Sequence, residues 1–360
     1  MTATTLPPKL ARLIRHDVQG MHAYAVQPSA GLVKLDAMEN PHRLPPELQR
    51  ALGERLATVA LNRYPGERVA TLRDALARHA GMPEGFSLML GNGSDELISL
   101  LAMACDVPGA SILAPVPGFV MYGMSAQLQG LKFIPVDLTP DFELDERAML
   151  AAIEQHQPSI VYLAYPNNPT ANLWDDAVIE RIVEAAPGLV VIDEAYQPFA
   201  SRTYADRITR HEHVLLMRTL SKFGLAGVRI GYMIGRSALI GEIDKVRPPY
   251  NISVLNCEAA LFALEHAGVF DAQAAELRRE RGRVLEALGA MPGVKAWRSD
   301  ANMILVRVPD ADAAFQGMKA RGVLVKNVSK MHPLLDRCLR LTVGTADENA
   351  QMLQALQASL

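Results

Sequence analysis

Residues 215–234 read LLMRTLSKFGLAGVRIGYMI, in which two apolar runs flank a short polar segment that contains Lys222. Gly224 and Gly227 follow this lysine and indicate a tight backbone, while the flanking apolar residues are typical of buried positions. A partly desolvated lysine loses its ammonium proton more readily, and its amine can then form a Schiff base with a carbonyl. Lys222 is therefore a candidate catalytic residue, although a half-buried lysine that extends its ammonium group into water would give the same pattern.

The same stretch carries groups that suit an anion. Thr219 and Ser221 supply hydroxyls and Arg229 supplies a guanidinium, which together suit a phosphate close to the carbonyl. An aldehyde that also carries a phosphate describes pyridoxal phosphate. We therefore expect this cofactor, and its remaining contacts have to come from other parts of the chain.

Strand-like and helix-like segments alternate over most of the chain. Continuous apolar runs such as Val190–Ile192 predict strands covered on both faces, as in a parallel sheet between helices. We expect an α/β fold with a large, doubly wound, mostly parallel sheet domain at residues 33–252, a smaller α/β domain at 253–360 and an N-terminal arm at 1–32. The expected strands include Val33–Met38, Arg229–Ile234 and Val323–Asn327.

Polar side chains follow two of the expected strands. Asp193 directly follows the apolar run at 189–192, Tyr196 lies three residues later, and Asn168 follows the strand that ends near residue 164. Ligands of doubly wound folds gather at the carboxyl ends of the strands. There Asp193 would pair with a protonated pyridine nitrogen, while Asn168 and Tyr196 would hydrogen-bond the ring 3-oxygen. The alternative for Asp193 is a purely structural cap on the next turn.

A glycine turn between a strand and a helix offers a second anion site. The sequence GNGSDE at 91–96 places the backbone N–H groups of Ser94 and Asp95 at a helix N-terminus, where the helix dipole favours negative charge. The same residues also suit a plain helix cap without a ligand.

Two further residues have both a functional and a structural interpretation. Tyr122 offers an aromatic face on which a planar ring can stack, or it is a core tyrosine. Arg340 lies between Leu339 and Leu341 in an expected strand, so its guanidinium needs an anion or solvent. It is either a bidentate clamp for a substrate carboxylate or an exposed arginine of an edge strand.

Composition excludes several classes of function. The chain has 360 residues and a formal net charge of −3, which argues against a general nucleic-acid or membrane-surface binder. No apolar run is long enough to span a membrane, and the N-terminus carries charges throughout, so we expect a cytoplasmic protein. The three cysteines are far apart and the histidines lack ligand spacing, so no metal site is expected.

The candidate residues occur in a characteristic order: an Asn-Pro-Thr loop, Asp-x-x-Tyr, Ser-Lys, a nearby arginine, and a late arginine in a strand. Over most of its length the sequence resembles the fold type I pyridoxal-phosphate aminotransferases, and most closely the group that acts on histidinol phosphate. The motifs that carry the resemblance are KLDAMENP, NRYPGERVATLRDALA, GNGSDELI, YPNNPT, VIDEAYQPF, RTLSKFGLAGVRIGY, SDANMILVR and LRLTVGT.

The resemblance implies a role for each residue. Lys222 is the lysine that binds the cofactor covalently and moves the proton, Asp193 contacts the pyridine nitrogen, and Asn168 and Tyr196 contact the 3-oxygen. The phosphate contacts are Ser94, Asp95, Thr219, Ser221 and Arg229, with Tyr122 stacked on the ring. Arg340 would grip the substrate carboxylate, and the substrate phosphate would contact Tyr24 of the arm with Asn327 or Lys326. Tyr64 would reach the cofactor phosphate of a neighbouring subunit, which implies a homodimer.

The implied reaction is transamination between L-histidinol phosphate, or imidazole-acetol phosphate, and 2-oxoglutarate, or L-glutamate, in histidine biosynthesis. An aromatic amino-acid aminotransferase and a phosphothreonine decarboxylase of the same fold are the alternatives. A ligand-sensing regulator with this fold is a remote one, since the segment before Val33 is too short for a helix-turn-helix domain. The chain departs from the family pattern at Ala171, where glycine is common, and its Lys222–Arg229 segment is one residue shorter than in many relatives.

Overall fold

The computed structural model describes residues 6–21 and 27–360, and the chain divides into two compact units, Met1–Gly31 and Leu32–Leu360. In the first unit, the expected arm contains two short helices, α1 (Pro8–Ala11) and α2 (His16–Gln19). An exposed ion pair of 2.6 Å joins Arg15 and Asp17 at the start of α2. Tyr24 lies outside the described residues, so its expected role stays a prediction.

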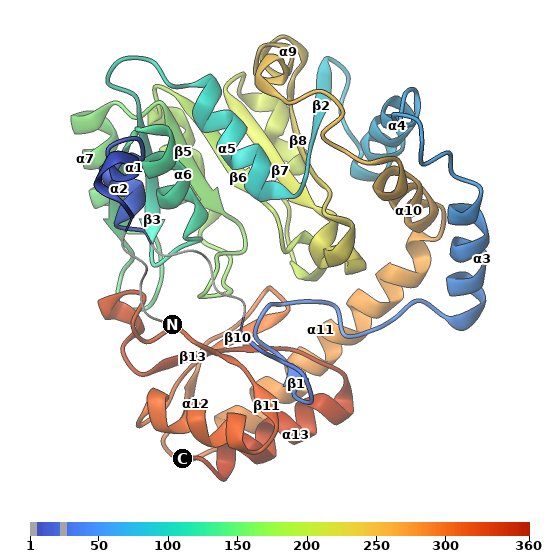
Figure 1. The fold of residues 1–360 in the computed structure, drawn as a ribbon. Coiled ribbons are helices and arrows are strands. Elements are labelled where there is room, and N and C mark those ends of the chain that lie inside the picture. Colours follow the sequence, from blue (N-terminus) through green and yellow to red (C-terminus); the bar gives the residue numbers. More distant parts are fainter. Residues whose placement is uncertain (1–5, 22–26) are drawn as a thin grey trace. The chain divides into compact units, whose positions relative to one another are not determined.

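The second unit contains a seven-stranded sheet in the order β2-β8-β7-β6-β5-β3-β4 (Figure 1). Its strands are β2 (Phe86–Gly91), β3 (Ser111–Val116), β4 (Lys132–Asp137), β5 (Ile160–Ala164), β6 (Leu189–Asp193), β7 (Val214–Thr219) and β8 (Gly231–Arg236). Strand β8 runs opposite to the other six strands, which are parallel to one another, and this confirms the mostly parallel sheet. The expected strand at Arg229–Ile234 begins later, because Arg229 adopts a left-handed conformation with φ of 55°.

Helices cover both faces of this sheet. On one face, α5 (Ser94–Ala104), α6 (Met121–Gln129) and α9 (Ser237–Ile243) pack on alternate strand residues such as Ile160 and Tyr162. On the other face, α4 (Arg68–Ala80), α7 (Glu146–His156), α8 (Asp176–Ala185) and α10 (Val254–Glu265) pack on the intervening residues, such as Val161 and Leu163. The two-sided burial explains the continuous apolar runs in these strands. Helix α3 (Pro46–Ala57) begins with a proline, which suits the first turn of a helix.

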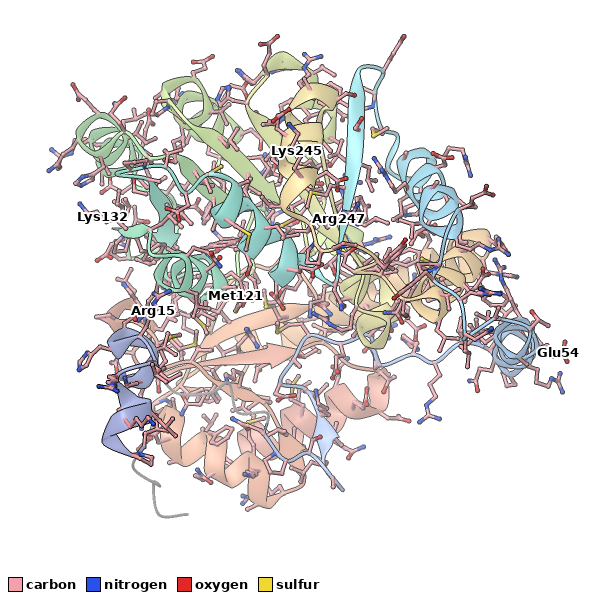
Figure 2. The ribbon with its side chains drawn as sticks, turned by 45° about the horizontal axis from the view of Figure 1, so that its top comes forward. Arg15, Glu54, Met121, Lys132, Lys245 and Arg247 are labelled. Atoms are coloured by element: carbon pink, nitrogen blue, oxygen red, sulfur yellow. The ribbon has the colours of Figure 1, made fainter. Side chains whose placement is uncertain are left out.

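The C-terminal region forms a four-stranded antiparallel sheet in the order β12-β13-β10-β9. Its strands are β9 (Lys295–Ala296), β10 (Met303–Arg307), β12 (Lys326–Asn327) and β13 (Cys338–Thr342), and its helices are α11 (Ala267–Gly289), α12 (Ala311–Ala320) and α13 (Ala346–Gln357). In the large sheet, β4 is an edge strand. It begins with the exposed Lys132 (Figure 2), and charged residues at a sheet edge oppose pairing with another chain.

Two expected strands are wrong in their extent. The segment at Val323–Asn327 is interrupted at Val325, so that β11 (Val323–Leu324) pairs with β1 and β12 pairs with β13. Strand β1 is only Val33–Lys34, because the chain turns at Met38, which has a φ of 51°. Leu35 and Met38 pack in the hydrophobic core of the C-terminal region. The expected boundary between the residues up to 252 and those from 253 stays a prediction.

No helix of the described residues is long and apolar enough to cross a membrane. The cytoplasmic location expected from the sequence stays a prediction.

The fold brings the carboxyl ends of the parallel strands to one edge of the large sheet. Asp193 ends β6 and Thr219 ends β7, and these strands are direct neighbours. The loop that contains Asn168 follows β5, the neighbour of β6 on its other side. The polar residues predicted from the sequence therefore gather where such folds bind ligands.

Leu163 tests how far stability depends on the buried sheet. It is fully buried in the interior strand β5, and we expect Leu163→Ala to lower the free energy of unfolding by about 3 kcal/mol, because it removes apolar contacts and leaves a cavity. Leu61→Ala is the matched control, since Leu61 is 70% exposed and its loss leaves no cavity. Urea unfolding measures both; equal midpoints for the two variants would contradict the expectation.

Candidate active site

Lys222 lies just beyond the end of β7, in a wide helical turn at Ser221–Leu225. Its Nζ donates a hydrogen bond to the carbonyl oxygen of Ala37 at 3.0 Å. Burial, followed by the nearby Arg340 guanidinium, lowers the pKa of Lys222 to about 8. A lysine with this pKa is partly neutral near physiological pH, which a nucleophilic or basic amine requires.

Asp193 ends β6 and is only 4% exposed. Its Oδ2 accepts a hydrogen bond from the Tyr122 hydroxyl at 2.7 Å, and its Oδ1 accepts one from the Ala195 backbone N–H at 3.0 Å. Burial raises the pKa of Asp193 to about 6, against the opposing effect of the Tyr122 hydrogen bond. No cationic side chain among residues 6–21 and 27–360 forms an ion pair with it. A buried carboxylate without a cation suits a ligand that brings positive charge.

Tyr196 lies near both Lys222 and Asp193. Lys222 Nζ lies 5.8 Å from the centroid of the Tyr196 ring, and the Asp193 carboxylate is near enough to contribute to the raised pKa of the Tyr196 hydroxyl, which burial dominates. The structure thus places the predicted lysine, carboxylate and tyrosine close together.

A chain of hydrogen bonds joins Arg340 to this centre. Arg340 is 8% exposed on β13, and its Nη1 donates to Asn168 Oδ1 at 2.7 Å. Because an arginine only donates, the Asn168 oxygen faces Arg340 and its Nδ2 donates to the Tyr196 hydroxyl at 3.1 Å. A second guanidinium nitrogen, Nη2, donates to the Asp36 carbonyl at 2.7 Å. Of the two interpretations of Arg340, the exposed edge-strand arginine is therefore wrong.

The residues expected at the phosphate also lie together. Arg229 Nη1 donates to Ser221 Oγ at 3.3 Å, Arg229 Nη2 lies 3.5 Å from Asp95 Oδ2, and Thr219 Oγ1 contacts Ser221 Oγ at 3.0 Å. The shorter segment between Lys222 and Arg229 therefore still brings the guanidinium to Ser221.

The backbone around this cluster leaves room only for glycine. Gly93 precedes α5 with a φ of 82°, and a Cβ there would lie 2.5 Å from Arg229 Nη2. A Cβ on Gly231 would lie 2.6 Å from the backbone nitrogen of Ser94. Hydroxyls, a guanidinium and the N-terminal N–H groups of α5 thus converge on one point, and this donor set fits a phosphate monoester.

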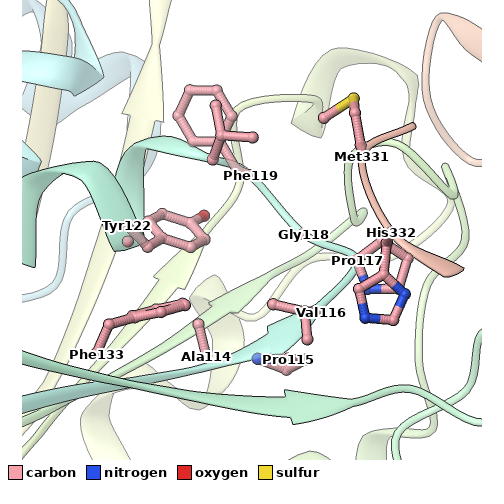
Figure 3. Close-up of a pocket in the computed structure, with 12 residues that line it drawn as sticks. Ala114, Pro115, Val116, Pro117, Gly118, Phe119, Tyr122, Phe133, Met331 and His332 are labelled. Atoms are coloured by element: carbon pink, nitrogen blue, oxygen red, sulfur yellow. The ribbon is translucent and has the colours of Figure 1, made fainter. Parts of the chain in front are cut away.

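Tyr122 lies next to Asp193. It is 2% exposed, and its ring stacks on Tyr162 with centroids 4.3 Å apart, so that this face of the ring is already covered. Phe119, which meets Tyr122 edge-on, lines a cavity of about 200 Å³ between the loop after β3 and the segment that contains Met331 and His332 (Figure 3). The Tyr122 hydroxyl donates a hydrogen bond to Asp193, and its expected stacking on the cofactor ring stays a prediction.

Asn327 is also not brought to the site. In the register of β12 and β13, Lys326 lies opposite Arg340 and Asn327 lies opposite Leu339. Since directly opposed residues share a face of the sheet and neighbours alternate, Asn327 faces away from Arg340. Its Nδ2 donates to Asp312 Oδ1 at 2.7 Å, on the α12 side. Of the two expected candidates, Lys326 therefore shares the face of Arg340, and its expected contact with the substrate phosphate stays a prediction.

Tyr64 lies on the surface. Its side chain is 74% exposed, and its ring stacks on that of Tyr250 with centroids 4.2 Å apart. Its expected contact with a neighbouring subunit stays a prediction.

Several contributors escaped the sequence analysis. The carbonyl oxygens of Asp36 and Ala37 hold Arg340 and Lys222, and backbone oxygens carry no sequence signal. The buried ion pair of Glu194 and Arg218, 2.8 Å apart, lies next to Asp193 and Thr219. Its signal was present in the sequence, since an arginine inside the apolar run of β7 needs a buried partner.

A doubly wound sheet with a lysine and a buried carboxylate at one edge is the arrangement of fold type I pyridoxal-phosphate enzymes. The family model for aminotransferase class I and II matches residues 30–356. The chain is 73% identical over 365 residues to the histidinol-phosphate aminotransferase of Polaromonas naphthalenivorans, with 100% of both chains covered. It is 71% identical over 358 residues to the histidinol-phosphate aminotransferase of Methylibium petroleiphilum, covering 99% of this chain and 96% of the relative.

The crystal structure of histidinol-phosphate aminotransferase from Sinorhizobium meliloti in complex with pyridoxal-5'-phosphate has the same fold, with a TM-score of 0.81 at 23% identity and 96% of each chain covered. The chain belongs to the class I and II aminotransferase family. Pyridoxal phosphate is the cofactor of this family, and the lysine, the buried carboxylate and the anion-binding donors described above fit it.

Gly93→Ala tests the phosphate cluster. The added Cβ would clash with Arg229 Nη2, so we expect the dissociation constant of pyridoxal phosphate to rise about tenfold, as for the loss of one charged hydrogen bond. Gly109→Ala is the matched control: Gly109 has a similar φ of 86°, but a Cβ there meets nothing within 4 Å. Fluorescence titration of the cofactor-free variants measures the affinity. If Gly93→Ala and Gly109→Ala bind pyridoxal phosphate with equal affinity, the expectation is contradicted, because the clash with Arg229 then has no effect on the phosphate site.

Proposed function

We propose that the chain catalyses pyridoxal-phosphate-dependent transamination between L-histidinol phosphate and 2-oxoglutarate in histidine biosynthesis. The observation that carries the proposal is the set of groups at one edge of the sheet: the Lys222 amine, the buried Asp193 carboxylate and the Arg340–Asn168–Tyr196 chain of hydrogen bonds. The choice of substrate is supported by relatives that are 73% and 71% identical over nearly the whole chain and are named histidinol-phosphate aminotransferases.

Different groups would hold the two ends of the cofactor. Its phosphate would be bound by Arg229, Ser221, Thr219 and the N-terminus of α5. The Asp193 carboxylate would accept a hydrogen bond from the protonated nitrogen of its ring. Asn168 and Tyr196 would hydrogen-bond the ring 3-oxygen. When bound, pyridoxal phosphate withdraws electrons from the substrate α-carbon and so makes its proton acidic.

Lys222 carries the proton. Its pKa of about 8 leaves a fraction of the amine neutral at physiological pH, so that Nζ can accept the α-proton and later return it. The Ala37 carbonyl, 3.0 Å away, orients this amine in the described structure. Asp193 supports the same step by keeping negative charge next to the ring nitrogen.

The substrates present different anions, and two cations on one face of the small sheet suit them. Arg340 would bind the carboxylates of glutamate or 2-oxoglutarate. Its hydrogen bonds to Asn168 and to the Asp36 carbonyl fix the position of the guanidinium for this contact. Lys326, opposite Arg340 in the β-ladder, would bind the phosphate of histidinol phosphate. Its ammonium forms no ion pair within the described part of the chain, which leaves it available for a ligand.

A homodimer would complete the site. Tyr64 and Tyr250 form an exposed aromatic pair that a second subunit would cover, and Tyr64 would then reach the neighbouring cofactor phosphate. Tyr24 of the N-terminal arm would contact the substrate phosphate.

The absorbance spectrum of the purified protein tests the reaction and its alternatives. With L-histidinol phosphate or L-glutamate added, we expect the visible band of the bound cofactor to disappear, and 2-oxoglutarate should restore it after glutamate. L-Phenylalanine and phosphothreonine should leave it unchanged. Conversion of phenylalanine, or release of carbon dioxide from phosphothreonine, would instead establish one of the two alternative enzymes.

The Lys222→Ala variant is the negative control for this experiment, since it removes the amine and should abolish both the visible band and turnover. Lys245→Ala should keep both, because Lys245 is exposed and forms a surface ion pair with Glu242. A Lys222→Ala protein that retained turnover would remove Lys222 from the mechanism.

A pair of adjacent variants tests the phosphate contact. We expect Lys326→Ala to raise the KM for L-histidinol phosphate about tenfold while the KM for L-glutamate changes less than twofold, because only the former substrate loses a charged partner. Asn327→Ala is the control, since Asn327 faces the opposite side of the sheet. The assignment fails if Asn327→Ala has the larger effect or if both substrates are affected equally by Lys326→Ala.

A further inference from the structure

The hydroxyl of Tyr122 is fixed in place by its surroundings. The residue lies in the first turn of α6 and is 2% exposed. Its ring stacks on Tyr162 with 8° between the ring planes, and Phe119 meets it edge-on at 5.6 Å. Figure 3 shows Phe119 and Tyr122 on the same side of the cavity. A ring packed on two sides has little rotational freedom. The packing of the core therefore fixes the direction of the Tyr122 hydroxyl, which donates a hydrogen bond to Asp193 Oδ2 at 2.7 Å.

The other groups around Asp193 do not replace this donor. The Ala195 N–H donates to the other carboxylate oxygen, while Asp95 and Glu194 are negative charges that raise the pKa of Asp193. Tyr162 and Tyr196 are near, but Tyr162 finds no hydrogen-bond partner in the described part of the chain. Tyr122 is therefore the one side-chain donor to Asp193 among the described residues.

We infer that Tyr122 is a positioning residue for the aminotransferase reaction: its hydroxyl keeps the Asp193 carboxylate ionised and oriented toward the ring nitrogen of the cofactor. The inference rests on the proposed function. Each carboxylate oxygen has a second lone pair, so the bond from Tyr122 leaves room for the ring N–H. A carboxylate that accepts hydrogen bonds is a weaker base, and a weaker base leaves the proton on the ring nitrogen, where it is needed.

The effect of Tyr122 on Asp193 has a definite sign. Burial raises the pKa of Asp193 in the folded protein to about 6 from an ordinary value of 3.8, so the folded state keeps a proton that the unfolded chain has already lost. Stability therefore falls as the pH rises through this window. Removing the Tyr122 donor raises the pKa of Asp193 in the folded protein further. The loss of stability with rising pH then extends to higher pH and becomes larger.

The test compares Tyr122→Phe with Tyr162→Phe in the cofactor-free protein. Both changes remove one hydroxyl from the same stacked pair and keep the ring, but only the first hydroxyl contacts Asp193. At pH 8 we expect the unfolding temperature of Tyr122→Phe to lie about 3 °C below that of Tyr162→Phe, and the difference to shrink at pH 5, where Asp193 is protonated.

The inference would be overturned if the difference in unfolding temperature between the two variants were the same at pH 5 and at pH 8. A loss of packing alone does not depend on the ionisation of Asp193 and would give this result. This measurement needs no cofactor, so its failure leaves the aminotransferase proposal standing.

A kinetic experiment on the holoenzyme gives a second readout. With saturating pyridoxal phosphate, Tyr122→Phe should lower kcat about tenfold and leave the KM for L-glutamate within twofold, because Asp193 acts on the ring and not on the substrate. Tyr162→Phe should match the unmodified enzyme in both constants. A rise in KM with unchanged kcat would overturn the inference, whereas absence of turnover in the unmodified enzyme would overturn the proposed function instead.

Discussion

The burial of the Asp193 carboxylate at the end of β6 is the constraint on which the site depends. A carboxylate in this position costs free energy unless a donor or a cation accompanies it, and the described structure supplies only the Tyr122 hydroxyl and one backbone N–H. In the proposed site, a protonated pyridine ring would bring the missing positive charge. Cofactor binding would then also stabilise this edge of the sheet, because the bound cation would relieve the buried negative charge.

The strands around Asp193 are held by a second buried charge pair. Glu194 is 1% exposed and bonds with the Arg218 guanidinium, the Thr203 hydroxyl and the Tyr204 N–H. A buried pair of this kind adds little net stability, but loss of one partner would leave an uncompensated charge inside the sheet. Because Glu194 follows Asp193 and Arg218 precedes Thr219, the pair ties the end of β6 to the end of β7. The ion pair therefore fixes the position of Asp193 relative to Thr219, one of the residues expected at the cofactor phosphate.

The sequence predicted what depends on pattern and order, and not what depends on register or on the backbone. Strand β5 has the bounds expected from its apolar run, Ile160–Ala164, because two-sided burial leaves a continuous signal. The position of Lys326 beside Arg340 could not be predicted, since a shift of one residue in β12 would exchange its face with that of Asn327. Ala171 adopts a φ of 66°, so this alanine keeps the conformation that glycine would provide, at a cost in strain that composition does not reveal.

The carbonyl oxygens of three consecutive residues connect the two ends of the site. Asp36, Ala37 and Met38 accept hydrogen bonds from Arg340, Lys222 and Asn302 respectively, and Thr342 donates its backbone N–H to Leu35 just before them. A carbonyl group binds a guanidinium or an amine more weakly than a carboxylate does, because it carries only a partial charge. In the proposed reaction, a substrate anion at Arg340 would therefore displace the Asp36 carbonyl without leaving a buried charge unpaired. The short segment after β1 supplies a backbone acceptor to each of the two cationic side chains, Arg340 and Lys222.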